Sequence, residues 1–245
     1  MLELRNIVWS LPGGEKIING ISMSAGAGKL TVVTGPNGGG KTSIAKLTAG
    51  LYTPASGQIL LDGQDITALD MTQRAKLGIA FAFQQPVHFK GLTVRDLLEI
   101  SAEDKLEEGK LCGLLSKVGL CARDYIDRPV DASLSGGEIK RIEIATVLAR
   151  KNARLLVFDE PEAGIDLWSF SSLIEVFRAL REERDRALLV ISHQERILEI
   201  ADEIVVIAGG RVRESGPRET VLPMLLAGEK QGSCPIRPDE YKPSC

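Results

Sequence analysis

Gly35-Pro36-Asn37-Gly38-Gly39-Gly40-Lys41-Thr42 follows an apolar, β-branched run at residues 30–34 and precedes a helix-compatible run at residues 43–47. This order predicts a strand, a loop and a helix, which is the setting that a phosphate-binding loop requires. The glycines let the backbone curl, so that its N–H groups and a helix N-terminus face a polyphosphate. Lys41 can reach the β- and γ-phosphates, and the Thr42 hydroxyl can ligate Mg²⁺. A glycine-rich turn that ends in Lys-Thr by chance has a probability on the order of 1%.

The composition is that of a globular protein with buried parallel strands. The 245 residues are 44% hydrophobic but only 4% aromatic, so the apolar residues are mainly aliphatic. Aliphatic runs are typical of parallel strands that helices cover on both faces. The formal net charge of -3 gives no general attraction to nucleic acid. We therefore expect no nucleic-acid partner.

The sequence lacks the apolar segments that membrane insertion requires. No apolar run approaches the length of a bilayer-spanning helix, and residues 1–5 do not resemble a signal peptide. These features predict a cytoplasmic protein without direct membrane insertion. The four cysteines, at positions 112, 121, 234 and 245, form no CxxC pair, so neither a zinc site nor a disulfide framework is indicated. Residues 229–245 are polar and Pro-rich, which predicts a C-terminal tail.

The N-terminal segment has the pattern of a hairpin. Residues 1–30 alternate apolar and polar positions and turn through Pro12-Gly13-Gly14, which predicts two antiparallel strands. Trp9 and Leu11 share one face. Core packing is the first interpretation of these side chains. The alternative is a platform for the adenine ring of a nucleotide.

A helical lobe is predicted after the strand at residues 78–83. Gln84 ends this strand, and the carboxyl ends of parallel strands are where open α/β sheets bind ligands. In residues 91–132 apolar positions recur at helical spacing around a charged segment, residues 103–110. This pattern indicates helices without strands, and we interpret the charged segment as a solvated face or loop.

Leu134-Ser135-Gly136-Gly137-Glu138 begins an amphipathic helix. Ser135 is a plausible N-cap, and Glu138 follows it at the spacing of a capping box. A Ser-Gly-Gly helix start also offers bare N–H groups and a positive dipole end, so the functional interpretation is a second phosphate site. Because the chain already has one phosphate-binding loop, a second site suggests that two copies share their nucleotides.

Two carboxylates follow the apolar strand at residues 155–158. Asp159 and Glu160 are expected at its carboxyl tip, pointing to opposite sides. Asp159 suits Mg²⁺, and Glu160 could orient or deprotonate an attacking water. His193 follows the strand at residues 187–192 and could hydrogen-bond a γ-phosphate at the same sheet edge, whereas a lone histidine is otherwise a surface or core residue. The remaining predicted elements are a strand at residues 58–63, helices at 71–76 and 167–184, and a hairpin at 203–207 and 210–214.

These segments, taken in order, resemble the ABC-type ATPases over the whole chain apart from the tail. The resemblance depends on the phosphate-binding loop, Gln84, residues 134–138, Asp159-Glu160, Asp166 and His193. It implies an α/β fold with a P-loop NTPase core built on a mainly parallel sheet, an N-terminal antiparallel β-subdomain and an inserted α-helical subdomain.

The resemblance also implies one domain at residues 1–228. Residues 1–84 and 150–228 would form the catalytic core, and residues 85–149 would form the helical lobe that carries the signature.

The site residues follow from the same resemblance. Two copies would form a head-to-tail dimer that sandwiches two Mg-ATP molecules, each between the phosphate-binding loop of one copy and the signature of the other. Thr42, Gln84 and Asp159 would hold or sense Mg²⁺, and Glu160, His193 and Gln84 would be catalytic. Asp166 would communicate across the dimer. The residues expected to bind nucleotide are Gly35, Pro36, Asn37, Gly38, Gly39, Gly40, Lys41, Thr42, Ser43, Ser135, Gly136, Gly137 and Asp166.

Three stretches resemble SufC more than a transporter subunit: residues 81–87, residues 136–144 and Glu162 before Gly164-Ile165-Asp166. SufC-like proteins are soluble ATPases of iron–sulfur cluster assembly that bind SufB- or SufD-type scaffold proteins, and the short helical lobe and the tail suggest a minimal system of this kind. Two departures from the family stand out. Leu11 replaces the aromatic residue that usually stacks on adenine, and the signature ends in Glu138 where transporters commonly carry Gln.

Three hypotheses for function follow. The first is an ATPase whose ATP-dependent dimerisation drives a conformational change in a SufB/SufD-like scaffold. The second is the nucleotide-binding subunit of a membrane importer, in which the same dimer moves transmembrane helices. The third is an ATP-gated clamp or adaptor that binds nucleotide with little turnover.

Overall fold

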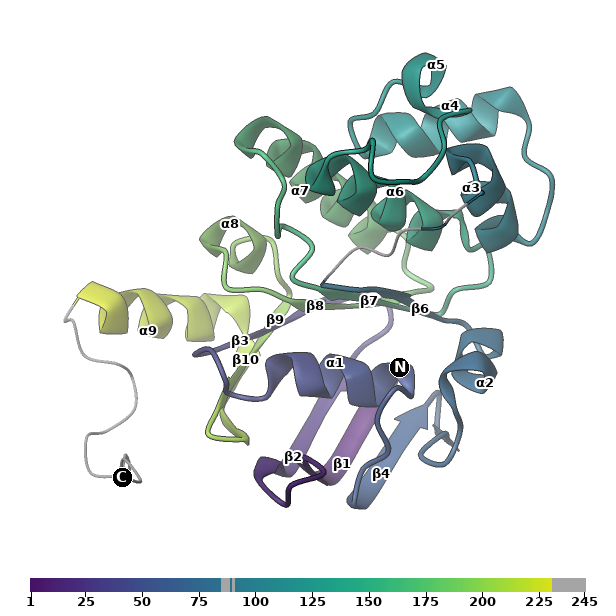
Figure 1. Cartoon of the computed structure of the whole chain (residues 1–245). Coiled ribbons are helices and arrows are strands. Elements are labelled where there is room, and N and C mark those ends of the chain that lie inside the picture. The colour runs from purple at the N-terminus through teal and green to yellow at the C-terminus, as the bar shows by residue number, and fades with distance from the viewer. Residues whose placement is uncertain (85–88, 90, 231–245) are drawn as a thin grey trace.

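The computed structural model describes residues 1–84, 89 and 91–230, without the side chains of residues 167–168 and 228–230. Two β-sheets lie on either side of helix α1 (Lys41–Ala49), and the helices of the helical lobe cover the opposite face of the larger sheet (Figure 1). The phosphate-binding loop connects the larger sheet to α1.

The larger sheet carries the strand ends on which the predicted site depends. Its six strands run in the order β10-β9-β3-β8-β7-β6, and every neighbouring pair is parallel except β9 and β10. The expectation of a mainly parallel sheet is therefore confirmed. Because β3 lies between β9 and β8, the loop after β3 emerges at the centre of the carboxyl edge. The strands are β3 (Leu30–Thr34), β6 (Ile79–Ala82), β7 (Leu155–Asp159), β8 (Ala187–Ile191), β9 (Glu203–Ala208) and β10 (Arg211–Pro217).

The central strands are buried on both faces. Every residue of β3, β7 and β8 is buried. Successive side chains point to opposite faces of a strand, and Val33 and Val157 accordingly pack in the core shared with α1, whereas Val32 and Leu156 pack in the core shared with the helical lobe. Burial on both faces explains why these strands read as continuous aliphatic runs.

The smaller sheet is antiparallel, as the alternating N-terminal pattern predicts. Its order is β2-β1-β4-β5, and β1 pairs with both β2 and β4. Leu2, Leu4 and Ile7 of β1 are buried against α1. The strands are β1 (Leu2–Ser10), β2 (Lys16–Ala25), β4 (Ser56–Leu61) and β5 (Gln64–Asp65).

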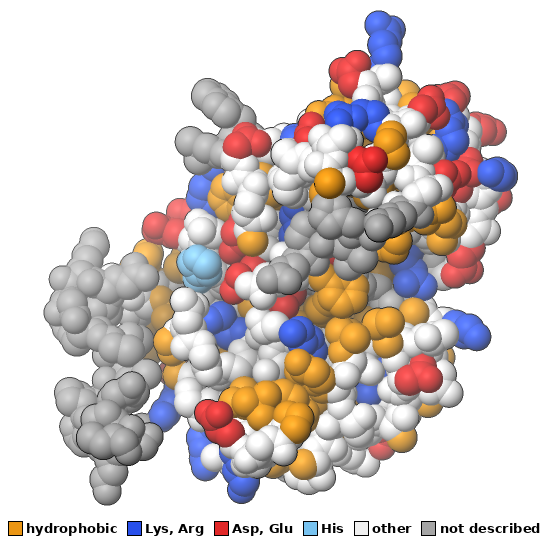
Figure 2. Space-filling view, viewed as in Figure 1, with side chains coloured by type: hydrophobic (Ala, Val, Ile, Leu, Met, Phe, Trp, Pro, Cys, Tyr) orange, Lys and Arg blue, Asp and Glu red, His pale blue; other side chains and the backbone are white. Residues whose placement is uncertain are grey.

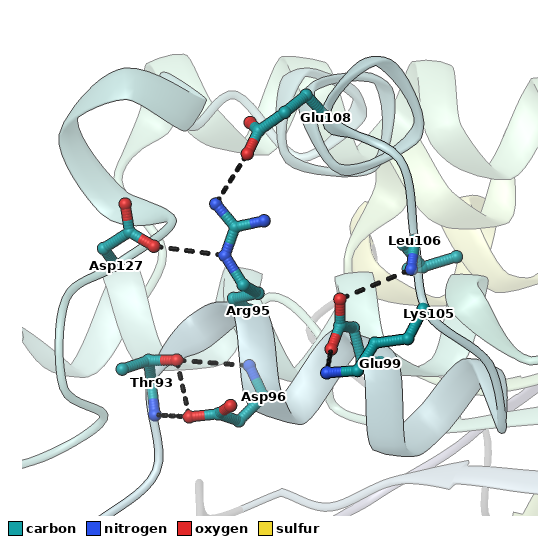
Figure 3. A network of polar contacts seen from close by, with 8 residues as sticks. All are labelled: Thr93, Arg95, Asp96, Glu99, Lys105, Leu106, Glu108 and Asp127. Carbon is teal, nitrogen blue, oxygen red and sulfur yellow. Dashed lines mark hydrogen bonds and ion pairs between the residues drawn. The ribbon is translucent and has the colours of Figure 1, made fainter.

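The helical lobe is held together by polar contacts as well as by its apolar core. Arg95 of α3 donates to Glu108 at the start of α4 (2.7 Å) and to Asp127 after α5 (3.1 Å), which joins three segments (Figure 3). The charged segment 103–110 is partly a loop, as expected. However, α4 begins inside this segment, and Leu106, which precedes α4, is buried. The helices on this side of the sheet include α3 (Val94–Ala102), α4 (Glu108–Lys117), α5 (Ala122–Tyr125), α6 (Gly136–Ala149) and α7 (Leu167–Glu182).

The C-terminal helix α9 (Arg218–Lys230) was not indicated by the sequence pattern, because Pro223 interrupts it. The predicted tail therefore overlaps the end of this helix, and residues 231–245, with Cys234 and Cys245, lie outside the described residues, as does His88. The remaining helices are α2 (Met71–Lys76), as predicted, and α8 (Glu195–Leu198). Within the described ranges, no helix combines the length and the apolar character needed to cross a membrane.

Candidate active site

The phosphate-binding loop has a backbone that only glycine fits at two positions. Gly35 has φ 132°, and a Cβ there would lie 2.0 Å from the carbonyl oxygen of Ile207. Gly40 has φ 103°, and a Cβ there would lie 2.6 Å from Ile18 Cδ1. Gly40 is also the N-cap of α1 and supplies no side-chain cap, so the first N–H groups of α1 stay available for an anion.

The Lys41 side chain folds back onto the phosphate-binding loop. Its side chain is 5% exposed, and its Nζ donates to the carbonyl oxygens of Gly35 (2.7 Å) and Pro36 (3.0 Å). Burial holds the pKa of Lys41 below its usual value, and the charges of Glu160 and Asp159 offset only part of this shift. The ammonium group is therefore fixed among the loop carbonyls and beside two carboxylates, where it can neutralise a phosphate charge.

Thr42 and Asp159 form an oxygen pair suited to Mg²⁺. The Thr42 hydroxyl donates to Asp159 Oδ1 at 3.3 Å, and Asp159 is 1% exposed. Burial raises the pKa of Asp159 to about 6, although the Thr42 hydrogen bond acts against the shift. Among the described residues, no group of three or more His, Cys, Asp or Glu side chains is placed to hold a metal. Two protein oxygens fit Mg²⁺, which usually takes its other ligands from water and phosphate.

Gln84 and Glu160 are in direct contact. Gln84 Nε2 donates to Glu160 Oε2 at 2.6 Å. The expected alternation of Asp159 and Glu160 along one strand stops at Asp159, because β7 ends there and Glu160 has a left-handed backbone with φ 46°. A left-handed non-glycine residue carries backbone strain, which is common where a side chain is aimed at a reaction site.

The N-terminal sheet closes one side of a cavity of about 380 Å³ beside the phosphate-binding loop. Trp9 is buried and stacks on Tyr52, with ring centroids 4.4 Å apart and planes at 9°. The core interpretation therefore holds for Trp9 but is wrong for Leu11, which is 40% exposed, and both side chains line this cavity. The sequence did not single out Tyr52. The cavity is lined by Trp9, Leu11, Ile17, Asn37, Gly38, Gly40, Lys41, Thr42, Ser43, Tyr52, Gln84 and Glu160.

Asp166 and His193 are not among the described residues that line this cavity. The Asp166 carboxylate accepts from the Ser169 N–H at 3.0 Å and from the Ser169 hydroxyl at 2.6 Å, at the start of α7. His193 is exposed. On the face shown in Figure 2, charged side chains of both signs lie among hydrophobic ones near the middle of the molecule. The Ser192 hydroxyl, beside it, donates to Glu162 at 2.5 Å.

The predicted signature has the capping geometry that its spacing indicates. The Ser135 hydroxyl accepts from the Glu138 N–H at 3.3 Å, and Glu138 accepts from the Ser135 N–H at 2.7 Å. A Cβ on Gly136 would meet no heavy atom within 4 Å, whereas one on Gly137 would lie 2.8 Å from the Gly164 carbonyl oxygen. This helix start is not part of the cavity lining, so its predicted phosphate would belong to another copy.

Two charged residues of α6 hold the backbone just before Gln84. Lys140 is fully buried and donates to the Phe83 carbonyl oxygen, while Glu143 accepts from the Phe83 N–H at 2.6 Å. Lys140 and Glu143 also form an ion pair at 3.3 Å. The sequence pattern did not indicate this contact, which joins residues 57 and 60 positions apart. The contact ties the signature helix to Gln84.

A family model described as ABC transporter matches residues 18–163 of this chain. The chain belongs to this family. An uncharacterised ABC transporter ATP-binding protein of Methanocaldococcus jannaschii is 36% identical over 216 residues, which cover 84% of this chain and 86% of that protein. The probable ATP-dependent transporter ycf16 of Cyanophora paradoxa is 28% identical over 243 residues, 93% of each chain.

Solved structures of ABC cassettes have the same fold. A nucleotide-free ATP-binding cassette from an ABC transporter superimposes with a TM-score of 0.80 and 25% identity, over 97% of this chain and 99% of that one. A cassette solved as a dimer with ADP and Pi gives a TM-score of 0.79 at 22% identity, over 89% and 99% of the two chains. The predicted ABC ATPase fold is confirmed, and this ABC chain is an ATPase that uses Mg-ATP.

Proposed function

We propose that this ABC ATPase is a SufC-like subunit whose ATP-dependent dimerisation changes the conformation of a SufB/SufD-like scaffold in iron–sulfur cluster assembly. One observation carries the proposal. Phe83 lies in one of the stretches that resemble SufC, of which residues 85–87 lie outside the described residues, and both its N–H and its carbonyl oxygen contact Glu143 and Lys140 of a second such stretch. The contact supports a route by which movement of the signature helix would reach Gln84.

The residues would act as follows. Lys41 and the N–H groups at the start of α1 bind and orient the β- and γ-phosphates. Mg²⁺, held by Thr42 and Asp159 with Gln84 nearby, would supply charge neutralisation on the phosphates. Glu160 accepts a proton from the attacking water once its carboxylate is released from Gln84.

The proposed dimer supplies the remaining contacts. Ser135, Gly136 and Gly137 of one copy donate to the triphosphate bound by the other copy. His193 donates to the γ-phosphate of the nucleotide at its own sheet edge. Asp166, just before α7, would transmit conformational changes between the two copies of the dimer. We retain the expected division of the domain into a core of residues 1–84 and 150–228 and a helical lobe of residues 85–149. We also propose that the protein acts in the cytoplasm.

An apolar groove next to Gln84 is suited to the scaffold partner. The groove encloses about 250 Å³, and its lining includes Phe81, Phe83, Phe89 and Ile100. Ile100 is 61% exposed and Phe89 is 42% exposed, and both line this one groove, so they form a contiguous apolar surface of the kind that marks protein–protein contacts. Because Phe83 belongs both to the groove and to the Lys140–Glu143 contact, a protein seated there would sense the position of α6.

The ATPase part of the proposal is tested with Glu160→Gln. This chain should bind ATP, accumulate a dimer with Mg-ATP and lose about 10²- to 10⁴-fold in turnover, because the amide cannot accept the proton. Light scattering after gel filtration measures the dimer, and phosphate release measures turnover. Glu175→Gln, at an exposed position of α7, is the control and should keep both properties of the wild type. Unchanged turnover in Glu160→Gln would show that Glu160 is not the base.

The partner is tested by affinity purification of tagged Glu160→Gln with Mg-ATP under anaerobic conditions. We expect a partner from the soluble fraction that holds iron and sulfide. Ile100→Asp should lose this partner while keeping its intrinsic ATPase activity, and Met71→Asp, which changes an exposed apolar residue outside the groove, should retain it. Recovery of a partner only from detergent-solubilised membranes would overturn the SufC-like proposal.

That outcome would favour the second candidate, the nucleotide-binding subunit of an importer. The names of relatives favour this candidate: a protein of Cucumis sativus named as a sulfate/thiosulfate import ATP-binding protein is 33% identical over 230 residues, 89% of this chain and 63% of that protein. In an importer the same groove would receive a segment of a membrane subunit.

A further inference from the structure

Glu138 is the residue in which the signature departs from the Gln that transporters commonly carry, and both of its carboxylate oxygens have partners. Oε2 accepts from the Ser135 N–H at 2.7 Å, and Oε1 accepts from the hydroxyl of Tyr125. Arg128 Nη1 lies 3.9 Å from the same Oε1. The carboxylate is therefore fixed in the rotamer of the capping box by a donor from outside its own helix.

The donor is itself held in place. Tyr125 is the last residue of α5, and the Arg128 guanidinium lies 5.2 Å from the centroid of its ring. The Tyr125 hydrogen bond, followed by those from Ser135, lowers the pKa of Glu138 to about 2, and the same hydrogen bond raises the pKa of Tyr125. The pair therefore keeps a charged acceptor and a protonated donor across the physiological pH range.

A carboxylate at this helix start has opposing effects. In one copy it stabilises the helix by capping Ser135 and by facing the positive end of the helix dipole. In the proposed dimer, however, the same helix start faces the triphosphate bound by the other copy. A carboxylate free to turn toward that triphosphate would repel it, since like charges within about 10 Å are poorly screened at 0.1 M salt.

We propose that Tyr125 is a positioning residue for the ATP-bound dimer, whose hydroxyl keeps the Glu138 carboxylate on its own helix start so that Ser135 and the Gly136–Gly137 N–H groups meet the partner's nucleotide. This role rests on the proposed function, because it requires two copies to share each ATP. It also gives α5 a part in assembling the shared site without any contact with the nucleotide.

The test measures the dissociation constant of the dimer at saturating Mg-ATP by sedimentation velocity, with every chain carrying Glu160→Gln. Adding Tyr125→Phe should raise this constant about tenfold, because the released Glu138 carboxylate can turn toward the triphosphate of the other copy and repel it. Adding Glu138→Gln alone should change it by less than about threefold, and Tyr125→Phe with Glu138→Gln should restore it to within about threefold, because the amide carries no charge. The weakening by Tyr125→Phe should also shrink between 50 and 500 mM salt.

Asp124→Asn is the matched control, because Asp124 is an exposed neighbour on the same helix, and it should leave the constant unchanged. The affinity of each monomer for ATP should be equal in all variants. An unchanged constant in Tyr125→Phe, or a weakening that Glu138→Gln does not rescue, would overturn the positioning role and leave the dimer intact. If the parent chain fails to dimerise with Mg-ATP, the proposed function is wrong and the role of Tyr125 with it.

Discussion

Asp159→Asn should make the nucleotide-free protein more stable at neutral pH, although it removes a residue of the metal site. Burial raises the pKa of Asp159 from 3.8 to about 6, so the folded chain binds a proton more tightly than the unfolded chain. Above about pH 6 the folded state must hold a buried charge, and this difference of about two pKa units costs about 3 kcal/mol. The cost falls as the pH is lowered through 6 and is largely gone near the unfolded-state pKa of 3.8, below which both states are protonated.

The asparagine amide has nearly the same shape and carries no charge, so it removes most of this cost. Its Oδ1 can still accept from Thr42, but Lys41 loses one of the two carboxylates that favour its ammonium form. We therefore expect a net gain of about 1–3 kcal/mol at pH 7.5 and about half of that gain at pH 5.0.

Urea unfolding followed by circular dichroism, at both pH values and without nucleotide, measures this gain. Asp104→Asn is the control, because Asp104 is 59% exposed and pairs with Lys151 at the surface, so its effect should stay within about 0.5 kcal/mol. In parallel, Mg-ATP should stabilise the wild type more than Asp159→Asn. A variant that is no more stable than the wild type at pH 7.5, or a gain of equal size at both pH values, would refute the reasoning.

The other predictions concern one binding residue and one structural residue. Lys41→Ala should lower ATP affinity at least 100-fold in isothermal titration calorimetry, because a charge-assisted contact with the phosphates is lost; unchanged affinity would contradict the phosphate-loop assignment. Arg74→Met should lower the free energy of unfolding by about 3–5 kcal/mol, because the buried guanidinium donates to four carbonyl groups, including Leu47 and Thr48 at the end of α1. Arg154→Met, at a side chain that is 65% exposed, should change the free energy of unfolding by less than about 0.5 kcal/mol. Equal effects of the two variants would contradict the stabilising role of the hydrogen bonds from Arg74 to the four carbonyl groups.

The part of the candidate site that could be predicted is the part built from consecutive residues. The glycines of the phosphate-binding loop, the capping box from Ser135 to Glu138 and the acidic end of β7 all depend on contacts within a few positions. The resemblance placed Gln84 near Glu160, and the structure joins them by a hydrogen bond across 76 positions. The roles proposed for His193 and Asp166 remain predictions.

Contacts between distant segments could not be predicted. Nothing near Trp9 or Tyr52 in the sequence indicates that the two rings stack, and the stretch around α5 gives no sign that Tyr125 bonds Glu138. Lys140 is a further case, because a lysine in an amphipathic helix is normally expected in solvent, whereas here it is fully buried against Phe83.

The sequence by itself determined the order of most elements, though not α9, and the chemistry of the phosphate-binding loop, because periodicity and backbone requirements act over a few residues. The tertiary structure alone decided which side chains from different elements share a hydrogen bond or a cavity wall. Those partners are chosen by the packing of helices against the sheet, which depends on the whole chain and leaves no local pattern.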